Sequence, residues 1–121
     1  MRAPGDFLHG TLDVLVLKTL TWQPMHGYGI ARWIEERSSG AFVLEDAALY
    51  KALHRLEASG AIGAEWGMSK NNRRARYYTL TAEGRRQLRA EAESWRAYAR
   101  AVAGVLDAAG IGARAKAGAG A

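Results

Sequence analysis

The sequence contains no cysteine, which excludes a disulfide framework and a metal site built on thiolates. Its absence is compatible with the reducing cytoplasm, where we expect the protein to be located. No apolar run approaches the length of a membrane span, and no charged-then-apolar leader opens the chain. We therefore expect a soluble protein that does not bind a membrane.

Motifs for catalysis are also missing from the sequence. There is no phosphate-binding loop, no paired-carboxylate motif and no nucleophile elbow. The histidines His9, His26 and His54 stand too far apart for metal-ligand spacing. The sequence therefore predicts neither an enzyme nor a bound metal or cofactor.

Acidic residues are scarce in one window, residues 66–89, although they outnumber basic residues before it. Residues 1–65 carry six Lys and Arg against eight Asp and Glu. Within residues 66–89, Glu83 stands alone against Lys70, Arg73, Arg74, Arg76, Arg85, Arg86 and Arg89. A solvated charge run is the usual explanation for such a cluster. On a predicted hairpin, however, the cluster favours a patch that binds a polyanion.

The most informative pattern lies in residues 45–60, EDAALYKALHRLEASG. Their apolar residues form one helical stripe: Leu49, Ala52, Leu53 and Leu56. The opposite face carries small residues, cations and one histidine: Ala47, Lys51, His54, Arg55 and Ala58. Small residues let a helix approach DNA closely, and cations meet phosphates and base edges. An ordinary amphipathic surface helix is the alternative, but the segments that follow favour a helix that reads the major groove.

The other predicted elements follow the order of a winged helix-turn-helix. Periodicity predicts a helix over 11–22, a turn over 25–29 that leads into a second helix, the helix over 45–60, strands over 62–66 and 75–80, and a helix over 82–108. The fold class is therefore mostly α with a small β-hairpin, a winged helix-turn-helix followed by a long C-terminal helix. We expect four aromatic side chains in the core: Tyr28, Trp33, Trp66 and Tyr78.

A chain of 121 residues is long enough for one domain with a modest core. We expect residues 1–8 to be a flexible lead-in and residues 9–80 to form the winged helix-turn-helix DNA-binding domain. Residues 81–109 are expected to form a C-terminal dimerisation helix. The Gly/Ala-rich residues 110–121 are expected to be a disordered tail.

Two of the predicted helices carry more apolar surface than a small domain is expected to cover. The first has too many apolar residues for one stripe, so burial on two sides is predicted, with a second chain as the natural cover. The last has a heptad seam through Leu88, Ala92, Trp95, Ala99, Val102 and Leu106. This helix could pack onto the first helix of its own chain. Its length of about 40 Å favours pairing with a second copy instead, as a homodimer.

Several segments, taken in their order, resemble the PadR family of bacterial transcriptional regulators. They are GTLDVLVLKTL at 10–20, HGYGI at 26–30, LYKALHRLEASGAI at 49–62, EWG at 65–67, NNRRARYYTLTAEG at 71–84 and ESW at 93–95. The single C-terminal helix is similar to the small subfamily. The resemblance implies a homodimeric winged-helix repressor, released from double-stranded operator DNA when a small aromatic or drug-like ligand binds.

The sequence departs from the family pattern at the start of the reading helix. Where the family usually has Ser-Leu-Tyr-Pro, this chain has Ala48, Leu49, Tyr50 and Lys51. Ala48 lacks a hydroxyl that could reach a phosphate, and Lys51 adds a cation to the face expected to meet DNA. We therefore do not expect this protein to share the operator sequence of a relative.

The predicted DNA contacts come from the reading helix and from the hairpin loop, or wing. We assign Tyr50, Lys51, His54 and Arg55 to the helix, and Lys70, Asn71, Arg73 and Arg74 to the wing. A wing lies along the DNA backbone or enters the minor groove, so these cations are expected to supply most of the salt-dependent affinity. The alternatives are that these cations are ordinary solvated charges, and that His54 only caps a helix or fills space.

The predicted effector site surrounds Trp95, in the middle of the seam. Two indoles related by a two-fold axis could sandwich a flat aromatic ligand between the subunits. The expected lining is Trp95, Tyr98, Leu12, Val16, Val102, Phe7 and Asp13, with Asp13 as the acid that attracts a cationic drug. The alternative is that Trp95 only fills the dimer interface. A DNA-binding dimer without an effector, controlled by a protein partner or by its own abundance, is the alternative function.

Overall fold

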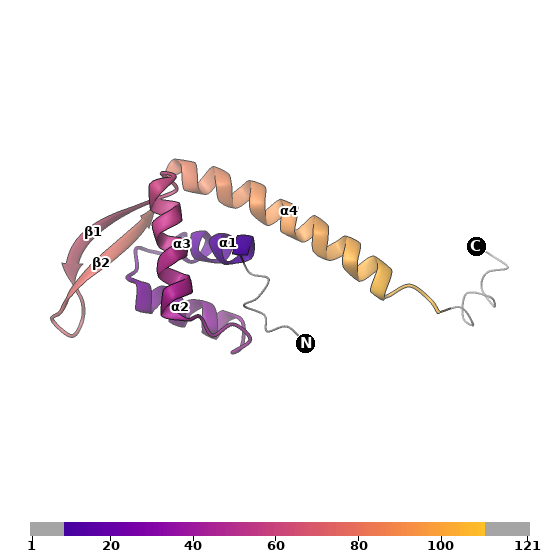
Figure 1. The fold of residues 1–121 in the computed structure, drawn as a ribbon, viewed down its shortest axis with the longest axis horizontal. Helices are drawn as coiled ribbons and strands as arrows, with labels where there is room; N and C mark the ends of the chain where they lie inside the picture. The colour runs from indigo at the N-terminus through magenta and orange to yellow at the C-terminus, as the bar shows by residue number, and fades with distance from the viewer. Residues whose placement is uncertain (1–8, 111–121) are drawn as a thin grey trace.

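The computed structural model describes residues 9–110, which form four helices and one two-stranded hairpin. In chain order these are α1 (His9–Thr19), α2 (Gly27–Arg37), α3 (Asp46–Ala58), β1 (Ile62–Met68), β2 (Arg74–Leu80) and α4 (Ala82–Leu106). The first three helices pack together, the hairpin projects on one side, and α4 leads away on the other (Figure 1). The predicted fold class is confirmed. The predicted lead-in, and the predicted tail after Gly110, lie outside the described residues.

The core lies where the three packed helices meet the base of the hairpin. The predicted stripe of α3 is confirmed, because Leu49, Ala52, Leu53 and Leu56 are each at most 1% exposed. They pack with fully buried side chains such as Leu17 of α1 and Ile30 of α2. Burial of each large side chain of this kind stabilises the fold by about 1.5 to 3 kcal/mol.

Helix α1 is enclosed by its own chain. Its apolar residues Leu12, Val14, Val16 and Leu17 are buried, and the helix contacts α2, α3 and α4. The expectation that a second chain is needed to cover its second side is therefore wrong. The reason is that α4, which follows the hairpin, passes beside α1 (Figure 1).

The four aromatic residues predicted in the core divide into two pairs. Tyr78 is buried, which raises the pKa of its phenol, and Trp33 is half-buried against the core. Tyr28 is 68% exposed and Trp66 is 61% exposed, so the prediction is wrong for both. Tyr28 lies in the first turn of α2, where its hydroxyl accepts a hydrogen bond from Arg32 on the outer surface. Trp66 lies on the outer part of β1, beyond the helices.

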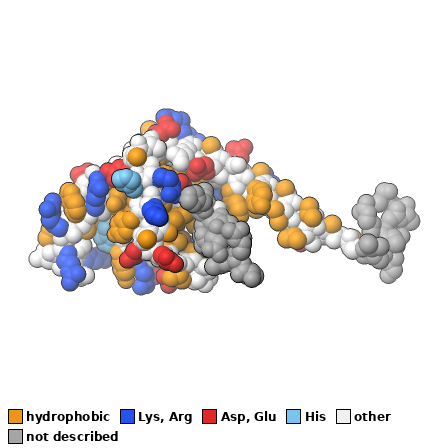
Figure 2. Space-filling view, in the orientation of Figure 1, with side chains coloured by type: hydrophobic (Ala, Val, Ile, Leu, Met, Phe, Trp, Pro, Cys, Tyr) orange, Lys and Arg blue, Asp and Glu red, His pale blue; other side chains and the backbone are white. Residues whose placement is uncertain are grey.

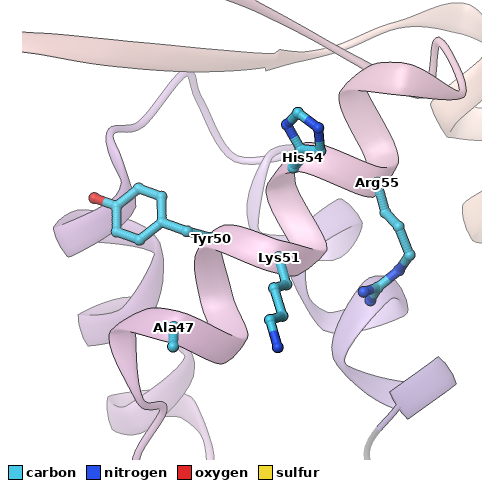
Figure 3. A pocket seen from close by; sticks show the side chains of 5 residues that line it. All are labelled: Ala47, Tyr50, Lys51, His54 and Arg55. Carbon is cyan, nitrogen blue, oxygen red and sulfur yellow. The ribbon is translucent and has the colours of Figure 1, made fainter.

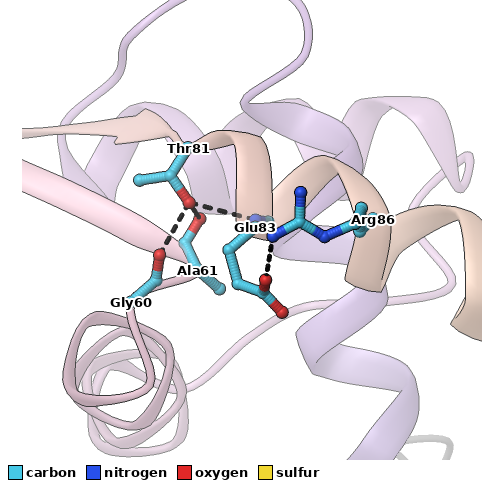
Figure 4. A network of polar contacts seen from close by, with 6 residues as sticks. Gly60, Ala61, Thr81, Glu83 and Arg86 are labelled. Atoms are coloured by element: carbon cyan, nitrogen blue, oxygen red, sulfur yellow. Dashed lines mark hydrogen bonds and ion pairs between the residues drawn. The ribbon is translucent and has the colours of Figure 1, made fainter.

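A set of polar contacts at Thr81 fixes the start of α4 against the end of α3 (Figure 4). Gly60 ends α3 with a φ of +82°, a left-handed conformation that suits glycine. The Thr81 hydroxyl accepts a hydrogen bond from the Gly84 N–H at 3.0 Å. It also lies 2.6 Å from the Gly60 carbonyl oxygen and 2.9 Å from that of Ala61, and it donates toward them. Thr81 is therefore the N-cap of α4, and its contacts hold the start of this helix beside the end of α3.

Gly84 allows α4 to approach the chain between α3 and β1, and Gly84→Ala is expected to destabilise the protein. A Cβ at residue 84 would lie 2.1 Å from the carbonyl oxygen of Ala61, which is backbone and cannot rotate away. We expect the free energy of unfolding, measured by urea denaturation, to fall by about 2 to 3 kcal/mol.

Gly104→Ala is the matched control, because nothing lies within 4 Å of a Cβ at residue 104 of the same helix. There the substitution is expected to raise the free energy of unfolding by up to about 1 kcal/mol, since alanine favours a helix. Both variants are compared at one protein concentration. Equal effects of the two substitutions would contradict the close approach at Gly84.

Candidate nucleic-acid interface

The outer face of α3 presents the side chains that the sequence assigned to DNA contact. Because the leucine stripe is buried, Tyr50, Lys51, His54 and Arg55 are turned outward, and all four are exposed. With Ala47 they line a shallow depression of about 480 Å³ (Figure 3). The small side chain of Ala47 leaves the surface open at the start of the helix. The predicted reading face thus exists as one continuous surface, which we call the α3 face.

Tyr50 lies at the flank of the α3 face that is closest to α2. A Cβ at Gly27 would stand 2.7 Å from the Tyr50 hydroxyl oxygen, so the glycine at the start of α2 leaves room for this ring. His26 begins α2 by accepting a hydrogen bond from the Gly29 N–H at its Nδ1, at 3.0 Å. This confirms that His26 belongs to the turn between α1 and α2.

Arg55 lies at the opposite flank and is paired with α1. Its guanidinium donates to a carboxylate oxygen of Asp13 at 2.6 Å. Asp13 was predicted to attract a cationic drug, but in this structure its carboxylate is occupied by Arg55. The ion pair joins α1 to α3 and partly neutralises one cation of the α3 face.

The wing residues Lys70, Asn71, Arg73 and Arg74 are all exposed, at or beside the tip of the hairpin. The turn is closed by the Ser69 N–H, which donates to the Arg73 carbonyl at 2.8 Å. Closer to the helices than the tip, Arg76 of β2 donates to Glu57 of α3 at 2.6 Å. This second ion pair ties the wing to the reading helix. Figure 2 shows basic side chains over both α3 and the hairpin on one face of the molecule.

The residues predicted to form the effector site are not brought together as one pocket. Trp95, Tyr98 and Val102 are exposed on α4, and the rings of Trp95 and Tyr98 lie 5.9 Å apart. Leu12 and Val16, in contrast, are buried in the core of their own chain and line no surface. Asp13 is paired with Arg55, as described above, and Phe7 lies outside the described residues.

The sequence reasoning missed a groove between α1 and α4. It encloses about 350 Å³ and is lined by Lys18, Leu88, Arg89, Ala92, Glu93, Arg96 and Arg100. It also missed the partners of Arg55 and Arg76, because pairs 42 and 19 positions apart leave no local signal in the sequence.

Among residues 9–110, no group of three or more His, Asp and Glu side chains is placed to hold a metal ion. None of the helices in this part of the chain has the length and apolar character needed to cross a membrane. The three packed helices, the hairpin beside the third helix and the cationic α3 face define a winged helix-turn-helix protein.

The chain belongs to the PadR-like family of transcriptional regulators, whose family model matches residues 16–90. The protein is therefore a transcriptional regulator and not an enzyme. PadR regulators bind DNA, generally as dimers.

Solved structures of transcriptional regulators from several bacteria have a similar fold. A PadR family transcriptional regulator from Eggerthella lenta is 29% identical with a TM-score of 0.72, covering 86% of this chain and 88% of that one. A transcriptional regulator from Clostridium thermocellum is 28% identical with a TM-score of 0.73, covering 80% and 94%. An uncharacterised protein of Lysinibacillus sphaericus is 29% identical over 91 residues, which is 75% of this chain and 84% of that protein.

Proposed function

We propose that this protein is a homodimeric repressor that binds operator DNA through the α3 face and the wing. In this proposal a small aromatic ligand, bound on α4, releases it from the DNA. The observation that supports DNA binding is the α3 face, where small and cationic side chains cover the solvent-exposed side of α3. An exposed helix of this kind suits the major groove, and a wing beside it suits the backbone. The proposal includes location in the cytoplasm, since a repressor acts where its operator DNA lies.

Lys51 and Arg55 differ in how available their positive charges are for contact with DNA. Within residues 9–110, Lys51 makes no ion pair, whereas Arg55 is held by Asp13 at 2.6 Å. Lys51 is therefore the helix cation that is free to meet a phosphate or a base edge. Arg55 reaches DNA only if it leaves Asp13 or shares its guanidinium between the two.

The homodimer is supported by the exposed apolar side chains of α4. Trp95, Val102 and Leu106 of the predicted seam are exposed, as are Tyr98 and Val105 on the same helix. The C-terminal half of α4 extends beyond the domain (Figure 1), so no other part of residues 9–110 packs against this surface. Pairing with a second copy would remove this apolar surface from water.

The effector part of the proposal rests on the neighbouring exposed rings of Trp95 and Tyr98. Two such pairs, one from each subunit, would offer aromatic faces to a flat ligand. A dimer that responds instead to a protein partner, or only to its own abundance, is the alternative, and the ligand experiment below separates the two.

Lys51→Ala is expected to weaken binding to a duplex from the protein's own promoter by about tenfold and to reduce the salt slope by about one. Binding is measured by fluorescence anisotropy at several salt concentrations. Arg55→Ala is expected to cost less, because its charge is already paired with Asp13. Lys18→Ala removes the same charge from α1 beside α4 and serves as the control. Equal losses for the Lys51 and Lys18 variants would reject the α3 face as the DNA contact.

Val102→Glu is expected to convert the dimer into monomers, because it buries an unpaired carboxylate in the seam. Sedimentation equilibrium measures the association. Ala97→Glu places the same charge on the exposed opposite side of α4 and should leave the dimer intact. A Val102→Glu protein that remains dimeric would show that the subunits associate elsewhere.

Flat aromatic compounds are expected to quench Trp95 fluorescence and to lower DNA affinity at the same concentrations. Fluorescence is measured on a protein in which the other three tryptophans are phenylalanine. DNA affinity is measured on the protein with all its other tryptophans in place, where Trp95→Leu should abolish the effect of the compounds. If no compound in a broad aromatic panel changes either signal, the regulator without a small-molecule effector becomes the supported function.

A further inference from the structure

The outer part of the hairpin carries exposed apolar and basic side chains on the same face. Trp66 is 61% exposed and Met68 is 57% exposed. The antiparallel register sets Arg76 opposite Trp66 and Arg74 opposite Met68, so these four side chains share one side of the hairpin. We call these four residues the wing face. Figure 2 shows hydrophobic and basic side chains interleaved over the hairpin.

The wing face continues the side of the hairpin that packs on the core. Ile62 and Tyr78 stand on this same side, nearer the helices, and both are buried. Farther out, the helices no longer cover the hairpin, and Arg76 reaches back to Glu57 of α3. Trp66 and Met68 therefore lie beyond the part of the hairpin that the helices cover. Both side chains are on the side of the hairpin that faces α3.

Arg76 is paired with Glu57, whereas Arg74 makes no ion pair within residues 9–110, so the charge of Arg74 favours an anionic partner. The guanidinium of Arg74 lies over the Trp66 ring, with its carbon 4.7 Å from the ring centroid. The acid of β1, Glu65, pairs across the strands with Tyr77 and so stands on the opposite side of the hairpin. A partner that fits this surface must offer anionic groups beside apolar ones. The sugar-phosphate edge of DNA offers both, since deoxyribose rings alternate with phosphates along the minor groove.

We infer that the wing face packs against DNA, with Trp66 and Met68 on deoxyribose rings and Arg74 on the neighbouring phosphate. This inference rests on the proposed DNA-binding function and adds to it an apolar contact that the cations of the wing do not provide. Deoxyribose is the same at every base pair, so this contact adds affinity and fixes the position of the wing without reading sequence.

The inference is tested by Trp66→Ala, measured on the promoter duplex at several salt concentrations. Loss of an apolar contact is expected to weaken binding by about tenfold and to leave the salt slope unchanged. Arg74→Ala, in contrast, should reduce the slope by about one. Trp22→Ala is the matched control, since Trp22 is 63% exposed and lies on the turn after α1. Urea unfolding verifies that each variant is folded.

Two further measurements separate the contact with DNA from other roles of Trp66. In an Arg74→Ala background, Trp66→Ala should still weaken binding; if it does not, Trp66 only supports Arg74 and the sugar contact is rejected. Trimming the ends of the duplex until the wing has no DNA beneath it should abolish the effect of Trp66→Ala.

Failure of this inference is distinguishable from failure of the proposed function. If the wild-type protein binds the duplex and both Trp66→Ala and Met68→Ala bind as tightly, the wing face does not contact DNA. If the wild-type protein itself does not bind duplex DNA, the proposed function is wrong, and the inference that rests on it is overturned with it.

Discussion

Burial of the leucine stripe of α3 is the interaction on which the rest of the structure depends. A helix that buries Leu49, Leu53 and Leu56 in one core has its rotation about its own axis fixed. Lys51 and His54 then face outward as a consequence of this rotation. The end of the same helix at Gly60 sets where the hairpin begins, and the contacts of Thr81 set where α4 begins. Helix α3, the wing and α4 thus share one point of attachment.

Two carboxylates shape the basic surface without contributing much to stability. Asp13 holds Arg55 and Glu57 holds Arg76, and both pairs are partly exposed, so each is worth at most about 1 kcal/mol. Their larger consequence is geometric. Glu57 ties the wing to α3, and Asp13 ties α3 to α1, the helix that lies against α4. The two ion pairs and the α1–α4 contact therefore connect the wing, α3, α1 and α4 in one chain of contacts.

The fold could be predicted largely from the sequence, because its strongest signals are local. The stripe of α3, the alternation of the strands and the Thr81 cap each depend on residues a few positions apart, and the structure contains all three. Trp66 could not be placed, because alternation shows which side of a strand a residue occupies but not where the covering helices end. Tyr28 was misplaced for a related reason, since an aromatic residue at the first turn of a helix can lie on either side of it.

The candidate site was predictable in its residue types but not in its pairing. The helical periodicity of residues 45–60 predicts which side chains of α3 are exposed. The count of charged residues in 66–89 predicts that the wing is basic. The capture of Asp13 by Arg55, and the burial of Leu12 and Val16, depend on how α1 packs between α3 and α4. The spacing of residues within α1 does not reveal that packing. Leu12 and Val16 were therefore assigned to the effector pocket, although they are buried and share no surface with Trp95.

Binding of the purified protein to duplex DNA from its own promoter, against scrambled competitor and at two salt concentrations, tests the central claim most directly. Tight binding that selects the promoter sequence and weakens steeply as salt rises is the expected result. Weak binding that ignores sequence would contradict the α3 face as a reader of DNA.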